Sequence, residues 1–231
     1  MSEESRAPGY VIATTGLRAE ARIATRSPTI KVAVGGGNAE RLDRLIRQAI
    51  AEGGNAIISF GVAAGLAPEL PAGTCLVGFE VVHGGTRHTA DPAWASRLKA
   101  ALAFAESATI AGVDRPLSKP SEKQALHIES AAAAADMESH IVARIAAEHG
   151  LPFAVLRVIA DPAERQIPPA ALAGMRPDGV IDVRAVLASL AGTPSQLPAL
   201  VRLAADTGRA MAALLRCRDL LGPGFGFRDL G

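Results

Sequence analysis

Short runs of apolar and β-branched residues recur along the chain, and most are followed by a longer stretch with helical spacing. This alternation predicts strands and helices in turn, and hence a largely parallel sheet. The expected strands are nearly continuous apolar runs, which is typical of a sheet covered on both faces. We therefore predict an α/β fold, a three-layer α/β/α sandwich with a mostly parallel or mixed central sheet.

The same pattern locates the expected elements. Strands are predicted at residues 11–15, 30–34, 56–60, 75–82, 109–113 and 153–160, and helices at 38–51, 92–105, 122–128, 137–149, 180–190 and 196–216. The segment 162–179 carries four prolines and two glycines and is predicted to be a loop that covers a site. We expect one domain over residues 1–231, in which residues 162–231 form this loop and the C-terminal helices. The run Ala131–Ala135 is expected to form a small-residue packing surface.

Charge and cysteine content exclude several classes of protein. The 24 Lys and Arg against 23 Asp and Glu leave a net charge of +1, which argues against electrostatic binding of nucleic acid or an anionic membrane. No apolar run is long enough to span a bilayer, and residues 1–10 are polar and acidic, unlike a secretory signal. Cys75 and Cys217 are too few for a disulfide scaffold. A cytoplasmic protein without membrane insertion is expected.

Motifs for cofactors and metals are incomplete. Gly35–Gly37 lies between a predicted strand and a predicted helix, as a dinucleotide-binding turn would. The third glycine of that fingerprint and the acidic residue after the next strand are missing, and so is the Lys-Ser/Thr ending of a P-loop. His83 and His88 have no Cys or carboxylate pair at ligand spacing. We therefore expect neither a cofactor nor a metal.

Three segments place polar residues where an α/β sheet binds ligands, outside the carboxyl ends of strands. Residues 14–20 come just past the first predicted strand, residues 136–139 start a predicted helix, and residues 156–161 end a buried strand. Three carboxylates, those of Glu20, Glu138 and Asp161, can therefore converge on one crevice. Each also has a simpler interpretation. Glu20 can be an exposed helix residue, Glu138 a first-turn carboxylate that interacts with the helix dipole, and Asp161 a turn former. Arg157 has none, because a guanidinium within an apolar strand must be paired or line a pocket.

These segments resemble a known enzyme family. The motifs are DMES at 136–139, LPFAVLRVIAD at 151–161 and ISFGVAAGLAPELPAGTCLV at 58–77. Together they resemble the superfamily of purine nucleoside phosphorylases and methylthioadenosine/adenosylhomocysteine nucleosidases, over most of the chain up to Asp161. Within it, the chain is most similar to the hopanoid-biosynthesis-associated phosphorylases, a subfamily thought to remove adenine from adenosylhopane to give a ribosyl hopane.

The resemblance implies a role for each candidate residue. Asp161 would protonate purine N7 as the glycosidic bond breaks, helped by burial that raises its pKa. Glu138 would accept hydrogen bonds from the ribose 2′- and 3′-hydroxyls, Met137 would pack against the sugar, and Arg157 would pair with site carboxylates. The purine would lie against three small residues, Ala63, Ala64 and Gly65.

The sequence departs from the phosphorylases where they bind phosphate. Their "RxGSxG" turn supplies an Arg and a Ser, whereas this chain has Ser59 and Val62 around Gly61. Glu20 matches the nucleosidase carboxylate that polarises water, so hydrolysis is favoured. The loop containing Gly16 and Arg18 also resembles a phosphate loop, which leaves phosphorolysis as the alternative.

The expected substrate is a purine nucleoside, with a hopanoid tail if the subfamily resemblance holds. The alternatives are a nucleosidase or phosphorylase of small soluble nucleosides, and a nucleoside-binding module without turnover. The helix at 196–216 is expected to cover the sheet, join a partner subunit or lie on a membrane surface, in that order. The resemblance implies a homo-oligomer, and a lipid substrate would place the enzyme peripherally on the inner face of the membrane.

Overall fold

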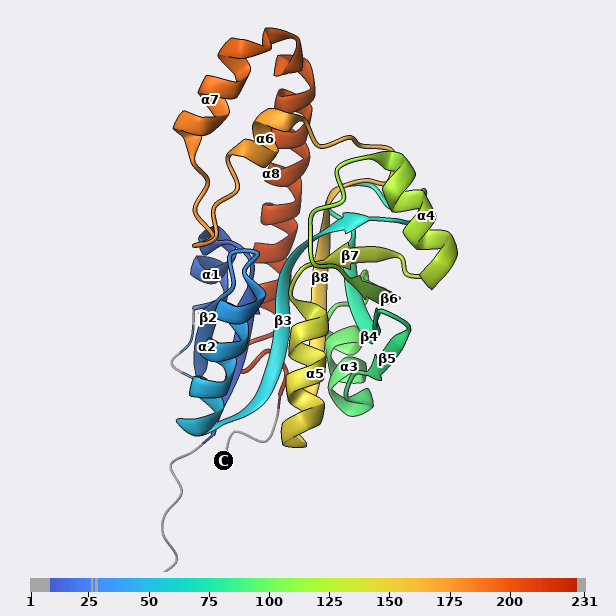
Figure 1. Ribbon diagram of the computed structural model, residues 1–231. Helices are drawn as coiled ribbons and strands as arrows, with labels where there is room; N and C mark the ends of the chain where they lie inside the picture. Colours follow the sequence, from blue (N-terminus) through green and yellow to red (C-terminus); the bar gives the residue numbers. More distant parts are fainter. Residues whose placement is uncertain (1–8, 26, 28, 228–231) are drawn as a thin grey trace, which may run out of the picture.

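Strands and helices alternate along the computed structural model, which describes residues 9–25, 27 and 29–227 (Figure 1). The strands are β1 Tyr10–Thr15, β2 Ile30–Val34, β3 Gly54–Gly65, β4 Cys75–His83, β5 Thr86–Thr89, β6 Glu106–Gly112, β7 Ala134–Asp136 and β8 Phe153–Asp161. The helices are α1 Arg18–Ala24, α2 Ala39–Ala51, α3 Pro92–Ala101, α4 Pro120–Ser130, α5 Ser139–His149, α6 Pro169–Ala173, α7 Val183–Gly192 and α8 Leu197–Leu220, with a 3-10 turn, η1, at Pro194–Gln196.

The sheet is mixed. Its strand order is β2-β1-β3-β7-β6-β4-β5, and β8 pairs with both β3 and β4. β3 is parallel to β1 and β8, whereas β8 is antiparallel to β4 and β7 is antiparallel to β3. Because β4 also pairs with β6, and β6 with β7, five of the strands form a closed ring.

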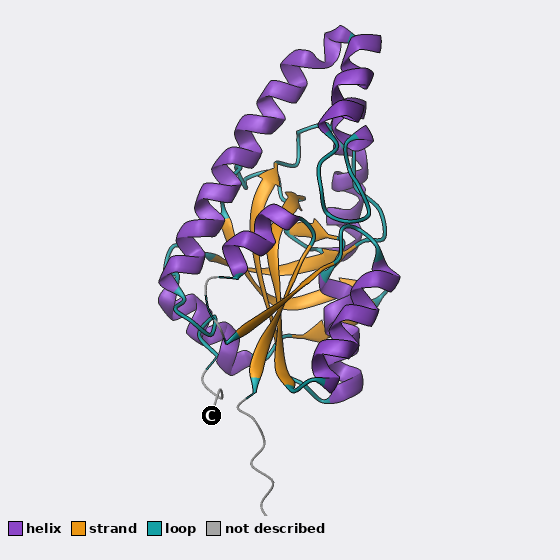
Figure 2. Ribbon diagram, turned by 90° about the vertical axis from the view of Figure 1, so that its left-hand side faces the viewer, coloured by secondary structure: helices purple, strands orange, loops and turns teal. Residues whose placement is uncertain are grey.

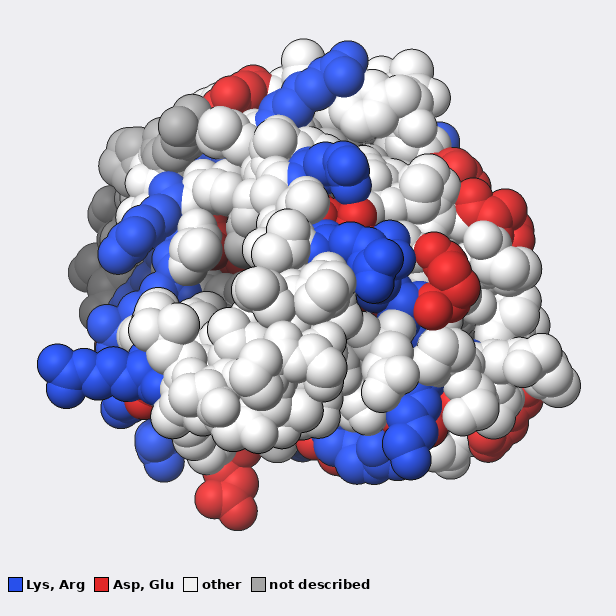
Figure 3. All heavy atoms as spheres, turned by 90° about the horizontal axis from the view of Figure 1, so that it is seen from above, with Lys and Arg blue, Asp and Glu red and all other residues white. Residues whose placement is uncertain are grey.

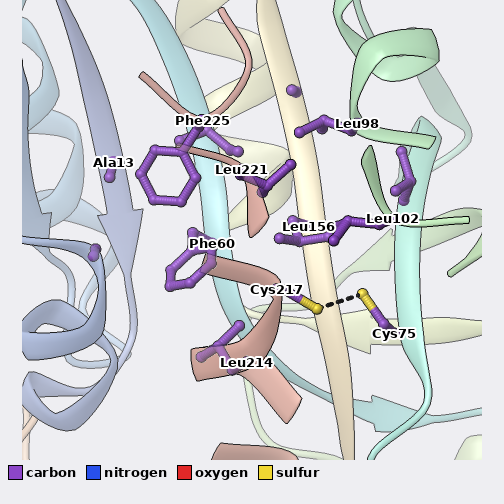
Figure 4. Packing of buried hydrophobic residues seen from close by; sticks show 14 of the residues in the cluster. Ala13, Phe60, Cys75, Leu98, Leu102, Leu156, Leu214, Cys217, Leu221 and Phe225 are labelled. Atoms are coloured by element: carbon purple, nitrogen blue, oxygen red, sulfur yellow. Dashed lines mark hydrogen bonds between the residues drawn. The ribbon is translucent and has the colours of Figure 1, made fainter. Parts of the chain in front are cut away.

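Helices cover both faces of this sheet, as Figures 1 and 2 show. On one face, α2 and α5 bury apolar residues such as Leu42 and Ile145 against the strands. On the other, α3 and α8 pack with the C-terminal segment, where the rings of Phe60 and Phe225 lie 4.9 Å apart (Figure 4). All nine residues of β8 are buried. The predicted three-layer α/β/α fold is confirmed, in its mixed form.

Four short elements were not predicted. β5 is a polar strand, and β7 has only three residues, two of them alanines, which are weak strand formers. The alanine run is therefore not one packing surface, because Ala131 caps α4 in a left-handed conformation (φ 57°) while Ala134 and Ala135 belong to β7. Helices α1 and α6, of seven and five residues, are too short for a periodic signal.

None of the helices within the described ranges is long and apolar enough to cross a bilayer. Residues 1–8, on which the prediction about a secretory signal largely rests, lie outside the described residues. The two cysteines are buried as free thiols, with their sulfur atoms 3.1 Å apart between β4 and α8 (Figure 4).

Candidate active site

A cavity of about 180 Å³ opens at the carboxyl ends of β1, β7 and β8. Its lining includes seven of the residues predicted from sequence, which are Gly16, Glu20, Ala63, Ala64, Met137, Glu138 and Asp161. These residues come from segments more than a hundred positions apart. The predicted convergence of three carboxylates on one hollow is confirmed.

Arg157 lies beneath the cavity, fully buried in β8 between two carboxylates. Its Nε is 2.9 Å from Oδ2 of Asp136, and its Nη2 is 3.3 Å from Oε2 of Glu138. Nη2 also donates to the hydroxyl of Ser59 at 2.6 Å, and Nη1 to the carbonyl of Val62 at 3.3 Å. A buried guanidinium is tolerated only with such partners. The predicted pairing with site carboxylates is confirmed.

Glu20 is 1% exposed, and its carboxylate accepts three backbone hydrogen bonds. Oε2 accepts from the N–H groups of Gly16 (2.9 Å) and Leu17 (2.7 Å), and Oε1 accepts from that of Val62 (2.8 Å). The side chain therefore caps α1 and fixes the first loop to β3, so the alternative of an exposed helix residue is wrong. Burial raises the pKa of Glu20, against the opposing charge of Arg157 and the three N–H groups.

Glu138 precedes α5 and shares the guanidinium of Arg157 with Asp136. Burial raises the pKa of Glu138; Arg157 opposes the rise, while the charges of Asp136 and Glu20 add to it. A Cβ atom on Gly16 would lie only 2.8 Å from Oε1 of Glu138. A glycine is therefore needed there for the loop to pass the carboxyl group so closely.

Asp136 was not assigned a role from sequence, although it begins the DMES motif. Its Oδ1 accepts the backbone N–H groups of Glu138 (2.8 Å) and Ser139 (2.6 Å), and its Oδ2 accepts the hydroxyl of Ser139 at 2.5 Å. Asp136 thus holds the start of α5 and the guanidinium of Arg157 at once, which sets the position of Glu138. The signal that points to it is an acidic residue just before a helix start.

Asp161 ends β8 and pairs with Lys123 of α4, a side chain with no exposed surface. Nζ of Lys123 lies 2.6 Å from Oδ2 of Asp161 and also donates to the carbonyls of Asp161, Pro162 and Arg165 at 2.9–3.1 Å. Burial raises the pKa of Asp161 to about 6, with Lys123 opposing the rise and Asp206 adding to it. Oδ1 has no hydrogen-bond partner in the described part of the chain and remains available to a ligand.

Substituting Lys123 by methionine is expected to raise the pKa of Asp161 further, by about one unit or more, because the opposite charge is lost. The uncompensated carboxylate should also lower the free energy of unfolding by about 3–5 kcal/mol at pH 8, and by less at pH 5, where Asp161 is protonated. Carboxyl-carbon NMR titration and denaturant unfolding measure the two effects. Lys119→Met removes an exposed lysine at the start of the same helix and should change neither. An unchanged Asp161 pKa in Lys123→Met would disprove the pairing.

Three predicted residues lie outside the cavity lining. Arg157 is behind it, as described above. Gly65 is the last residue of β3, and a Cβ there would lie 3.2 Å from the backbone of Pro162, so its small size serves chain packing. Arg18 is turned away: its Nε donates to the carbonyl of Asp178 at 3.3 Å, and its side chain is 56% exposed. In this structure, Arg18 is thus not positioned as a phosphate ligand.

Comparison with known sequences decides the family. The sequence profile of the phosphorylase superfamily matches residues 10–191. The chain belongs to the phosphorylase superfamily. It is an enzyme of that superfamily, as its motifs predict. No curated protein matches the chain significantly in sequence.

Solved structures share the fold of this superfamily member at low identity. The 5′-methylthioadenosine/S-adenosylhomocysteine nucleosidase of Helicobacter pylori, bound to butyl-thio-DADMe-Immucillin-A, is 16% identical with a TM-score of 0.66, over 92% of this chain and 98% of that chain. The S-adenosylhomocysteine nucleosidase of Streptococcus pyogenes, with 5-methylthiotubericidin, is 14% identical with a TM-score of 0.62, over 95% and 99%. Futalosine hydrolase of Helicobacter pylori is 18% identical with a TM-score of 0.60, over 67% and 88%.

Proposed function

We propose that this member of the phosphorylase superfamily hydrolyses the N-glycosidic bond of a purine nucleoside, and that its substrate is adenosylhopane, from which it releases adenine and a ribosyl hopane. The observation that carries the proposal is the set of three buried carboxylates, Glu20, Glu138 and Asp161, around one cavity. Such groups, with pKa values raised by their surroundings, are suited to acid–base work near neutral pH.

In the proposed reaction, Asp161 gives its proton to purine N7, so that the bond between C1′ and N9 breaks and neutral adenine leaves. The sugar becomes electron-poor, and hydrogen bonds from its 2′- and 3′-hydroxyls to Glu138 strengthen in that state. Water then attacks C1′ and passes a proton to Glu20. Met137 lines the cavity beside Glu138 and would pack against the ribose.

Water is the proposed nucleophile because the surroundings of the cavity are rich in negative charge. Asp136 and Glu138 pair with one guanidinium, that of Arg157, which also donates to Ser59 and whose charge acts on nearby Glu20. Among the described lining residues, the one basic side chain is that of Arg176, which pairs with Asp178 and Asp182. A phosphate dianion would therefore meet repulsion without an unpaired cation in this lining to balance it. Arg18, the candidate phosphate ligand, instead pairs with Asp178.

The apolar part of the cavity supports a large 5′ substituent. Val113, Pro116 and Leu117 line it from the segment after β6, and Ile167 and Met175 line it from the segment after β8. The predicted loop 162–179 thus contributes a wall, although it also contains α6, and α8 contributes no lining residue in the described part of the chain. A hydrocarbon tail would gain free energy from burial against these side chains.

Product analysis tests this function. The protein is incubated with adenosine, methylthioadenosine and adenosylhopane, each with and without phosphate, and the products are identified by mass spectrometry. We expect adenine and a free ribosyl product, unaffected by phosphate, with the highest kcat/KM for adenosylhopane. A sugar 1-phosphate formed only with phosphate would replace hydrolysis by phosphorolysis. Preference for methylthioadenosine would assign the enzyme to small soluble nucleosides, and binding without adenine release would contradict catalysis.

Two further expectations belong to this proposal. A triterpenoid substrate partitions into lipid, so the enzyme would work at the inner face of a membrane. The family resemblance also implies a homo-oligomer, in which a neighbouring subunit would complete the cavity.

A further inference from the structure

The helical hairpin formed by α7, η1 and the first part of α8, residues 183–205, is here called the arm. It extends away from the sheet, at the top of Figures 1 and 2. None of the ten residues of α7 is buried, although seven of them are alanine, leucine or valine, residue types that are often buried in a core. The arm therefore has an apolar surface with no partner among the described residues.

Large apolar side chains are concentrated on the arm. Val183 and Leu187 are 62% and 58% exposed and lie one turn apart on α7. Leu197 and Val201 are 50% and 58% exposed and lie one turn apart on α8. Two adjacent helices thus each expose an apolar stripe. Single exposed apolar residues are normal on a protein surface, whereas a cluster of them marks an interaction site.

The charge of the arm is one-sided. Residues 183–205 contain no Asp or Glu, and their only charged side chains are Arg184 and Arg202. Both arginines are exposed, and neither makes an ion pair within the described ranges. The net charge of +1 for the whole chain conceals this segregation. Figure 3 looks down on this end of the molecule and shows a broad uncharged area with Lys, Arg, Asp and Glu side chains around it.

The apolar surface continues from the arm to the mouth of the cavity. Met175 lines the cavity and is 44% exposed, and it forms an antiparallel bridge with Ile181, which is 49% exposed. Ile181 in turn lies two residues before Val183, where α7 begins. Apolar side chains therefore connect the arm to the cavity, beside Arg176, which also lines the cavity and pairs with Asp178 and Asp182.

We propose that the arm docks on the surface of an anionic phospholipid bilayer, with its apolar stripes among the acyl chains and Arg184 and Arg202 at the lipid phosphates. Exposed apolar side chains with arginines and no acids are the composition of interfacial helices. Dimerisation through the arm is less favourable than membrane docking. In a two-fold contact each arm would bring its two arginines to an equally basic surface, without a carboxylate to pair with them.

Vesicle sedimentation tests the docking without any substrate. The full chain is mixed with phosphatidylcholine vesicles with or without phosphatidylglycerol, and the bound fraction gives a partition coefficient. We expect binding to the anionic vesicles that weakens with added salt. The Leu187→Asn/Val201→Asn and Arg184→Glu/Arg202→Glu variants should each lower the partition coefficient about tenfold or more. Ile128→Asn, which changes a 75% exposed residue of α4, is the matched control and should bind normally.

The docking proposal rests on the proposed function and adds the membrane as a partner. The possible outcomes distinguish failure of one from failure of the other. The Asp161→Asn protein should bind vesicles like the wild type even if it releases no adenine. Equal binding by wild type and both arm variants, or no preference for anionic vesicles, would overturn the proposal. If Leu187→Asn/Val201→Asn instead converts a dimer into a monomer in sedimentation velocity, with vesicle binding unchanged, the arm is an interface between copies.

Discussion

Replacing Asp161 by asparagine is expected to slow adenine release by roughly 10²–10⁴-fold, the usual contribution of a general acid, while the protein stays folded. Asparagine keeps the shape of the side chain and a carbonyl oxygen for Lys123 but has no proton to give to N7. The wild-type kcat/KM should fall as pH rises through about 6, because the free enzyme must carry the proton on Asp161. The residual rate of the variant should lack this fall.

A matched control is available at Asp114, whose carboxyl is 76% exposed and which does not line the cavity. Asp114→Asn should leave both the rate and its pH dependence unchanged. Steady-state assays from pH 5 to pH 9, with circular dichroism to check folding, make the comparison. A folded Asp161→Asn enzyme with a near-normal rate would exclude the proposed acid.

Removing the guanidinium of Arg157, as in Arg157→Met, is expected to lower the free energy of unfolding by about 3–5 kcal/mol. Methionine fills much of the same volume, but Asp136 and Glu138 then lose their buried counter-charge. Without Arg157 to oppose the effect of burial, the pKa of Glu138 in the folded state should rise further above its value in the unfolded chain. The folded state then binds more protons, so stability should fall as pH increases and the variant should be least stable in alkali.

Denaturant unfolding at pH 5 and pH 8 measures both the loss and its pH dependence. Arg144→Met is the control, because this arginine pairs with Asp43 and Glu148 on the surface and its side chain is 47% exposed. Exposed pairs contribute at most about 1 kcal/mol. If both variants lose the same free energy of unfolding, the buried guanidinium has no special role in stability. Arg157→Met should also lose catalytic activity, because the carboxylates are no longer held in position.

The layers of the fold are predictable from the periodicity of the sequence, because buried strands and amphipathic helices leave strong local signals. β8 and α2 are examples, since an unbroken apolar run and a one-sided helix place them within one residue of their observed bounds. The convergence of Glu20 and Asp161 is predictable for a related reason: they lie at the carboxyl ends of two predicted strands, which meet at the same edge of the sheet. Glu138 is expected there at the start of a predicted helix, and β7, the strand that precedes it, was not predicted.

The partners of these carboxylates are not predictable in the same way. Lys123 lies on α4, whose sequence is mostly polar and does not indicate which residues are buried. Its burial follows from its pairing with Asp161 at the end of β8. The role of Asp136 depends on Arg157, twenty-one positions away and on another element. Local sequence carries no information on which distant charges meet, so pairs of this kind need coordinates.

The closed ring of strands has an implication for how this enzyme can diverge. β8 is hydrogen-bonded to β3 on one side and to β4 on the other. A single residue inserted before Arg157 would therefore turn its side chain to the opposite face and disrupt the hydrogen-bond register with both strands. The hairpin of residues 183–205 lies outside the sheet, where it packs on α6, and has no strand register to preserve. Relatives should therefore vary in length at that hairpin, where lipid or substrate preference can change, while the spacing between Arg157 and Asp161 stays constant.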